Sequence, residues 1–154
     1  MNIKNIFAGL FGKSDSATEA FGETAYDSMV FLLRCILENI QELTPVVVRC
    51  KTSYGAERKQ YVKDARLLGS SLVCQLNSLV ATFASYSTEP ITKVSTKVPG
   101  DVEEWCNEVH WHIVNLLGLC AKHGCDIVAC VDAQNAMNAL SKLHDVLVDM
   151  MNER

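Results

Sequence analysis

The chain has 154 residues, the length of a single domain, with 49% hydrophobic residues, 21% charged residues and only three prolines. This composition is typical of a globular protein and excludes a disordered chain. The formal net charge of −4 argues against a general nucleic-acid binder, because such proteins carry a strong positive excess.

The first predicted element is a short amphipathic helix followed by a linker, together residues 1–16, ahead of a single helical domain at 17–154. Its apolar residues recur at helical spacing and stop at a glycine: Ile3, Ile6, Phe7, Leu10 and Phe11, then Gly12. Lys4 and Asn5 interrupt the apolar residues, which a signal peptide would not allow. We expect this helix to dock on the bundle or on another copy of the chain, with a membrane-surface role as the alternative.

A long helix is predicted from Ala17 to Thr44. Its buried stripe follows the three- and four-residue steps of one helix face: Tyr26, Met29, Val30, Leu33, Leu37, Ile40 and Leu43. Pro45 is expected to end it, because the residue before a proline avoids the helical region. The β-branched run Val46–Val48 and the turn-rich residues 52–55 then predict an extended connection over 45–55.

A second long helix is predicted from Ala56 to Ser85, again with one apolar stripe at helical spacing. Gly69-Ser-Ser71 inside it favours the close approach of another helix over a break. Residues 86–100, bracketed by Pro90 and Pro99, are predicted to be irregular.

The best-specified element is a helical hairpin from Asp101 to about Met151. The first helix has the stripe Val102, Trp105, Val109, Ile113, Leu116, Leu117 and Cys120. Gly124 is expected to end it as a left-handed cap, and Asp126 to begin the last helix as its N-cap. Four helices of roughly 20 to 30 residues predict an all-α fold, an antiparallel four-helix bundle.

Seven cysteines, an odd number without a Cys-x-x-Cys pair, predict reduced thiols in a cytoplasmic protein. No apolar run approaches the about 18 residues of a membrane span, so no transmembrane segment is expected.

Positive charge is concentrated in the middle of the chain, where eight of the fourteen lysines and arginines lie between residues 49 and 97. If the two connections converge at one end of the bundle, that end can hold a phosphate-bearing small molecule or an acidic protein partner. Basic residues that are merely solvated around loops are the alternative interpretation.

Acidic residues offer a second candidate site. Glu104, Glu108 and His112 stand one turn apart on one helix face, a row that can ligate a hard divalent cation or share a proton. A complete site needs carboxylates from another helix, and Glu38 and Glu42 are the available donors. A zinc site built on Cys106 and His110 has less support, because the cysteines belong to the apolar stripe.

The run from Glu108 to Ile127, with Asn138 and Lys142 in the following helix, resembles the C-terminal helix pair of the MazG-type all-α nucleoside-triphosphate pyrophosphohydrolases. The resemblance implies hydrolysis of NTPs to NMP and pyrophosphate, with Mg²⁺ held by carboxylates from two helices, in dimers or tetramers. Glu108 matches the first acid of the family motif, but Trp111 stands where the metal-binding Asp belongs. Upstream, Glu42 is present and Asn39 replaces its partner acid.

These observations predict a non-catalytic binding protein without a cofactor. It would engage its protein partner or nucleotide through residues of the basic end and of the last two helices: Arg49, Lys51, Arg58, Lys59, Lys63, Lys93, Lys97, Trp111, Asn138 and Lys142. The first alternative is a Mg²⁺-dependent pyrophosphohydrolase with Glu38, Glu42, Glu104 and Glu108 as ligands. The second is a structural subunit of a homo-oligomer that packs through Trp111, Phe7 and Phe11.

Overall fold

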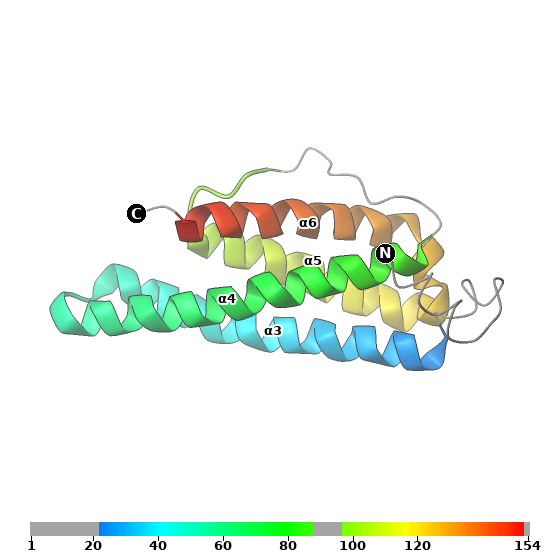
Figure 1. Ribbon diagram of the computed structural model, residues 1–154, viewed down its shortest axis with the longest axis horizontal. Helices are drawn as coiled ribbons and strands as arrows, with labels where there is room; N and C mark the ends of the chain where they lie inside the picture. Colours follow the sequence, from blue (N-terminus) through cyan, green and yellow to red (C-terminus); the bar gives the residue numbers. More distant parts are fainter. Residues whose placement is uncertain (1–21, 88–96, 153–154) are drawn as a thin grey trace.

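The computed structural model describes residues 22–87 and 97–152, which form an all-α helical bundle (Figure 1). Four long helices and one short 3-10 helix follow one another, and the described residues contain no strand: α3 (Glu23–Thr52), α4 (Gly55–Tyr86), α5 (Val102–His123), η1 (Gly124–Ala129) and α6 (Val131–Asn152). The all-α prediction is therefore confirmed. The helix predicted within residues 1–16 lies outside the described residues.

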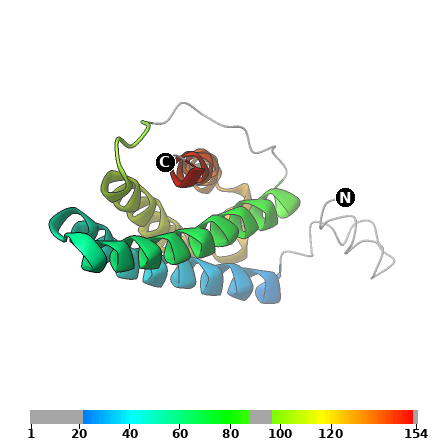
Figure 2. The same cartoon turned by 60° about the vertical axis from the view of Figure 1, so that its left-hand side comes forward.

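The four long helices surround one core. Helix α3 packs against α4 and α5, and α6 packs against the same two helices. In Figure 1, α3 runs from right to left and α4 returns from left to right; α5 then also runs from left to right, and α6 returns from right to left. Figure 2 shows the α3–α4 pair as one layer, and α5 and α6 lie together on one side of it. The last residues of α4 and the first residues of α5 therefore lie at opposite ends of the bundle.

Most residues of the predicted apolar stripes lie in the core, although Val30 and Leu37 of the α3 stripe are only half-buried and Ile36, outside that stripe, is fully buried. Two side chains also tie helices together by hydrogen bonds. The Trp105 side chain is fully buried, and its indole N–H donates to the Leu143 carbonyl of α6 at 2.8 Å. The Tyr26 hydroxyl donates to the Cys120 carbonyl of α5 at 2.9 Å. Both bonds join residues far apart in the sequence, so they fix how α5 sits against α6 and α3.

The prediction that this helix ends at Pro45 is wrong, because α3 continues to Thr52. Pro45 is exposed, so its missing N–H affects the side of the helix that water reaches. On the opposite face Leu43 and Val47 are buried, with 1% and 6% of their surface exposed. Burial of these two side chains, about 1.5–3 kcal/mol each, offsets the roughly 3 kcal/mol cost of proline inside a helix.

The connection between α3 and α4 is therefore only Ser53 and Tyr54, and the two helices form a long hairpin. Gly55 starts α4 with a φ of 63°, a left-handed conformation that glycine adopts without strain. The end of this hairpin projects beyond α5 and α6 (Figure 1). None of the residues 48–63 is buried. We call this segment the hairpin end.

Helix α4 matches its prediction, including the close approach at Gly69. Gly69 is buried, and a Cβ atom added there would lie 3.2 Å from the Met151 sulfur of α6. By length and composition alone α4 is apolar enough to cross a membrane, and 28% of its most apolar 18-residue stretch is buried in the bundle. Its largest apolar residues, among them Leu76 and Phe83, are fully buried in the core.

The turn between α5 and α6 differs from the prediction in one respect. Helix α5 ends at His123, and Gly124 has the expected positive φ, 58°. Asp126, however, is not the N-cap of α6, because residues 124–129 form η1 and α6 begins at Val131. Ile127 is fully buried, and its carbonyl accepts the Cys130 N–H at 3.0 Å. Burial of Ile127 therefore holds the chain in a tight turn where the sequence pattern indicated a helix start.

Candidate functional site

The hairpin end brings together five of the seven lysines and arginines that were predicted to form the basic end of the protein. All five are exposed on the last turns of α3 and the first turns of α4: Arg49, Lys51, Arg58, Lys59 and Lys63. Residues 49–66 contain six basic and two acidic residues, a net charge of +4 in a chain of net charge −4. Lys97 is exposed ahead of α5, and Lys93 lies outside the described residues.

Two arginines brace the hairpin end itself. The Arg49 guanidinium donates to the Tyr61 hydroxyl at 3.2 Å and lies 5.7 Å from the centre of the Tyr61 ring, which is a cation–π distance. Arg58 donates from Nε to the Cys50 carbonyl at 3.0 Å. Cys50 is in the last turn of α3, where carbonyls lack helical partners, so Arg58 satisfies one of them. Both arginines thus link the end of α3 to the start of α4 while their charge stays at the surface.

Lys51 is paired, which the sequence did not reveal. Its ammonium donates to Asp101 at 3.0 Å and to Glu103 at 3.1 Å, at the start of α5. These hydrogen bonds, to Asp101 first and Glu103 second, raise the pKa of Lys51. The pKa of Asp101 is lowered, first by the Glu104 N–H that its carboxylate accepts and then by Lys51. Lys51 therefore ties the hairpin end to α5, and its charge is already neutralised.

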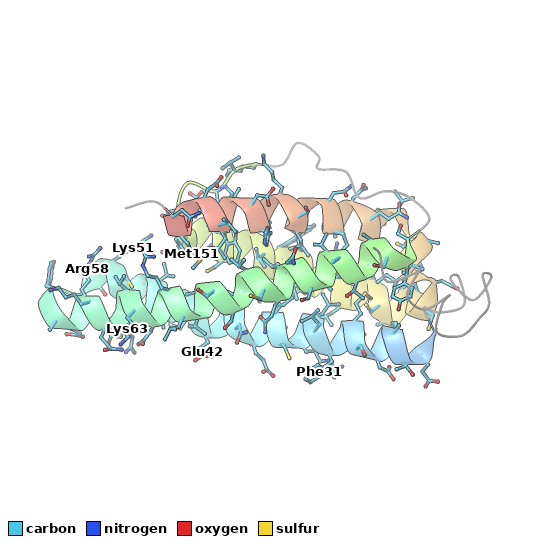
Figure 3. All side chains as sticks on the ribbon, viewed as in Figure 1. Phe31, Glu42, Lys51, Arg58, Lys63 and Met151 are labelled. Carbon is cyan, nitrogen blue, oxygen red and sulfur yellow. The ribbon has the colours of Figure 1, made fainter. Side chains whose placement is uncertain are left out.

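Lys59 and Lys63, by contrast, form no ion pair within the described part of the chain. Figure 3 shows Lys51 and Arg58 on the side of the hairpin that faces Met151, and Lys63 on the opposite side. The positive charges are therefore spread around a projecting hairpin and do not converge on one point. A small phosphate is bound best where several donors converge on its oxygens, and this surface lacks that geometry.

An apolar pocket of about 200 Å³ opens beside the hairpin end, where both its helices meet α5 and α6. We call it the hairpin pocket, and its lining comes from all four long helices: Leu43, Val47, Cys50, Val62, Ala65, Arg66, Gly69, Val102, Leu147, Met150 and Met151. Arg66 is the one charged residue in the lining, and its guanidinium donates to the Met151 carbonyl at 3.2 Å. The pocket therefore has apolar walls with a positive group among them.

The predicted acidic ligands do not form a metal site. Within residues 22–87 and 97–152 no three His, Cys, Asp or Glu side chains lie together as metal ligands would, so Glu38, Glu42, Glu104 and Glu108 are not brought together. Glu42 points away from the bundle in Figure 3. Glu104 instead caps the start of α5, where its carboxylate accepts the Gly100 N–H at 2.7 Å.

Two of the seven cysteine thiols, Cys106 and Cys120, are core groups. All seven are free, and Cys106 and Cys120 are buried in the stripe of α5. Burial raises the pKa of each of these two thiols to about 11, so both are protonated at neutral pH. A protonated thiol is a poor nucleophile and a poor zinc ligand.

The remaining predicted ligand residues lie on α5 and α6, apart from the hairpin end. Trp111 is 63% exposed, and Lys142 is partly exposed. Asn138 is 7% exposed, and its buried Oδ1 has no hydrogen-bond partner among the described residues. The structure therefore separates the predicted residues into the hairpin end and a second region around the α5–α6 pair.

We found no match to this chain among protein-family models, among curated proteins or among solved structures. The resemblance to the MazG-type pyrophosphohydrolases therefore stays a prediction that rests on the residues quoted for it.

Proposed function

We propose that this protein is a non-catalytic antiparallel four-helix bundle that binds an acidic, amphipathic segment of a partner protein at its hairpin end. The observation that carries the proposal is the pairing of two surfaces. Lys59 and Lys63 are exposed and have no acidic partner among residues 22–87 and 97–152, and they stand on the same hairpin whose base forms the apolar hairpin pocket. Lys63 lies on the side of the hairpin away from Met151 of the pocket (Figure 3), so a segment with acidic and apolar faces reaches both when it wraps around the hairpin end.

The geometry favours a protein partner over a phosphorylated small molecule. The cations point to different sides of the hairpin (Figure 3), so a single phosphate group contacts few of them. An acidic helix or extended segment presents several carboxylates over a longer distance. Such spread charges raise the association rate and select partners by charge, with their effect reduced by salt.

The hairpin pocket supplies an apolar contact surface, which the charged side chains alone do not provide. Its apolar lining takes an apolar anchor side chain out of water, and binding energy in protein interfaces is concentrated on such anchors. Met150 and Met151 form part of the lining, and unbranched methionine side chains adjust readily to an incoming group. Arg66 among these residues can pair with a carboxylate beside the anchor.

The test uses two labelled amphipathic peptides that share an apolar face of Leu and Phe but carry either Glu or Lys on the polar face. Fluorescence anisotropy should show that the Glu peptide binds the full-length protein, and that binding weakens with added salt. The variant Lys59→Glu/Lys63→Glu should weaken it by about tenfold. The matched control, Arg34→Glu/Lys122→Glu, changes the net charge equally at exposed positions away from the hairpin end and should bind normally.

Equal affinity for the two peptides, or equal affinity of the two double variants, would refute the proposed surface. Saturable binding of a nucleotide, without binding of the Glu peptide, would show that the ligand is a phosphorylated small molecule and not a protein segment. The two alternatives from the sequence, a pyrophosphohydrolase and a homo-oligomeric subunit, are checked by pyrophosphate release with Mg²⁺ and by sedimentation. No arrangement of acidic residues in the described structure favours the first.

A further inference from the structure

A second pocket lies away from the hairpin end, between the middle of α5 and the first two turns of α6. Its volume is about 330 Å³, and we call it the Trp111 pocket after the largest residue of its lining: Trp111, His112, Asn115, Asp132, Asn135 and Ala136. The hairpin pocket involves the last residues of α6, Met150 and Met151, whereas this one involves the first. The two sites are therefore at opposite ends of α6 and share no residue.

The aromatic wall of this pocket is held in place by a neighbouring ring. The Trp111 side chain is 63% exposed, although tryptophan has the largest apolar surface to bury. Its ring meets the His112 ring edge to face, with centroids 5.1 Å apart and an interplanar angle of 83°. The indole is therefore largely exposed and its π surface is accessible to a ligand.

The formal charge of the pocket is negative, and its polar groups include several hydrogen-bond acceptors. Asp132 contributes a carboxylate, Asn115 and Asn135 contribute amide oxygens, and no lysine or arginine belongs to the lining. Burial lowers the pKa of His112, and nearby Glu108 opposes this only in part, so the imidazole is neutral at pH 7. The buried Nδ1 of His112 has no hydrogen-bond partner among the described residues.

We propose that the Trp111 pocket binds a small planar organic cation, with a guanidinium group as the best match. A cation over the indole face is attracted by the negative quadrupole of the ring. A guanidinium is planar, so it can lie flat on Trp111, and its fork of N–H donors fits the Asp132 carboxylate in bidentate fashion. A phosphate or carboxylate ligand, in contrast, would meet Asp132 with no cation to compensate it.

The chain provides its own reporter for this proposal. Trp105 is fully buried with its N–H bonded to Leu143, so it contributes a constant fluorescence, and Trp111 senses the pocket. Arginine and citrulline share a backbone and a planar end group, but only the end group of arginine carries a charge. We expect arginine, and agmatine without the carboxylate, to change the fluorescence saturably with a dissociation constant on the order of 1 mM. Citrulline and lysine should bind at least about fivefold more weakly.

Variants separate the pocket from the rest of the protein. Asp132→Asn should weaken arginine binding by about fivefold or more, whereas Asp149→Asn, an exposed acid near the other end of α6, should leave it unchanged. Two-dimensional NMR should show shifts of the Asn115 and Asn135 side-chain amides on addition of arginine. Lys59→Glu/Lys63→Glu should bind arginine normally, so failure at the hairpin end and failure here are distinguishable.

The proposal is overturned if arginine produces no saturable change up to about 50 mM, well above the expected dissociation constant. It is equally overturned if citrulline binds as well as arginine, because the charge would then contribute nothing. Both comparisons use the unmodified protein, so they decide the matter even if a variant is destabilised. Equal loss of binding in Asp132→Asn and Asp149→Asn would also refute a site at this pocket.

Discussion

Replacement of Trp105 by phenylalanine should destabilise the bundle by about 2–3 kcal/mol, through two separate losses. The first is the hydrogen bond from its indole N–H to the Leu143 carbonyl at 2.8 Å, whose net contribution is about 1 kcal/mol. The second is the volume of the lost five-membered ring at a fully buried position. Truncation of a buried Trp to Ala costs about 3–5 kcal/mol, and phenylalanine retains most of that packing, so about 1–2 kcal/mol is the remaining cavity cost.

Urea unfolding followed by circular dichroism measures this loss. With a slope of about 1.5–2 kcal/mol per molar for a chain of this size, the midpoint should fall by roughly 1–2 M. Trp111→Phe is the matched control on the same helix, since Trp111 is 63% exposed and should cost less than about 0.5 kcal/mol. A loss below about 1 kcal/mol for Trp105→Phe, or equal losses for the two variants, would show that the core is not packed around Trp105 as described.

Three further changes test the helices and the core by the same unfolding measurement. Pro45→Ala should raise the free energy of unfolding by about 1–3 kcal/mol, because it restores an N–H inside α3; a loss of stability would mean that the helix needs the proline. Asn138→Leu should raise it by about 1 kcal/mol, since it removes a buried oxygen without a described partner, and a decrease would point to an unseen bond. His112 has a lowered pKa in the folded protein, so the unfolded chain binds more protons as the pH falls below the ordinary value of 6.5. Stability should therefore be complete above that pH and fall below it, and His112→Gln should show a smaller fall between about pH 7.5 and 5.5.

Much of the fold follows from the sequence because apolar periodicity is a local property. The stripes of α4 and α5 have few competing signals, and their predicted ends agree with the observed ends to within one or two residues. The two errors in helix boundaries are at Pro45 and Asp126. At each, contacts with residues distant in the sequence determine the structure in place of the local preference for a helix end or a helix start. Val47 is buried beyond the proline, and Ile127 is buried after the glycine, and neither burial is visible from neighbouring residues.

The candidate site was predictable in its charge but not in its shape. A cluster of basic residues around one connection is a sequence property, and the structure places five of them on one hairpin. The ion pair between Lys51 and Asp101 joins residues 50 positions apart in the sequence, so no local sequence pattern predicts it. The hairpin pocket needs Val47, Val62, Val102 and Met150 from four different helices, and each residue alone reads as ordinary core.

The length of the hairpin bears on whether its charge is functional. Within the bundle each helix gains stability by burial against two neighbours, but residues 48–63 contain no buried residue and gain little in this way. Solvated basic residues would serve equally well on a shorter loop, which would leave fewer residues to order. The chain instead extends two helices past α5 and α6, and braces them with Arg58 on Cys50 and with Lys51 on α5. A projecting, braced segment whose Lys59 and Lys63 have no ion pair in the described part of the chain is what a docking element requires, and this is why we prefer binding over simple solvation.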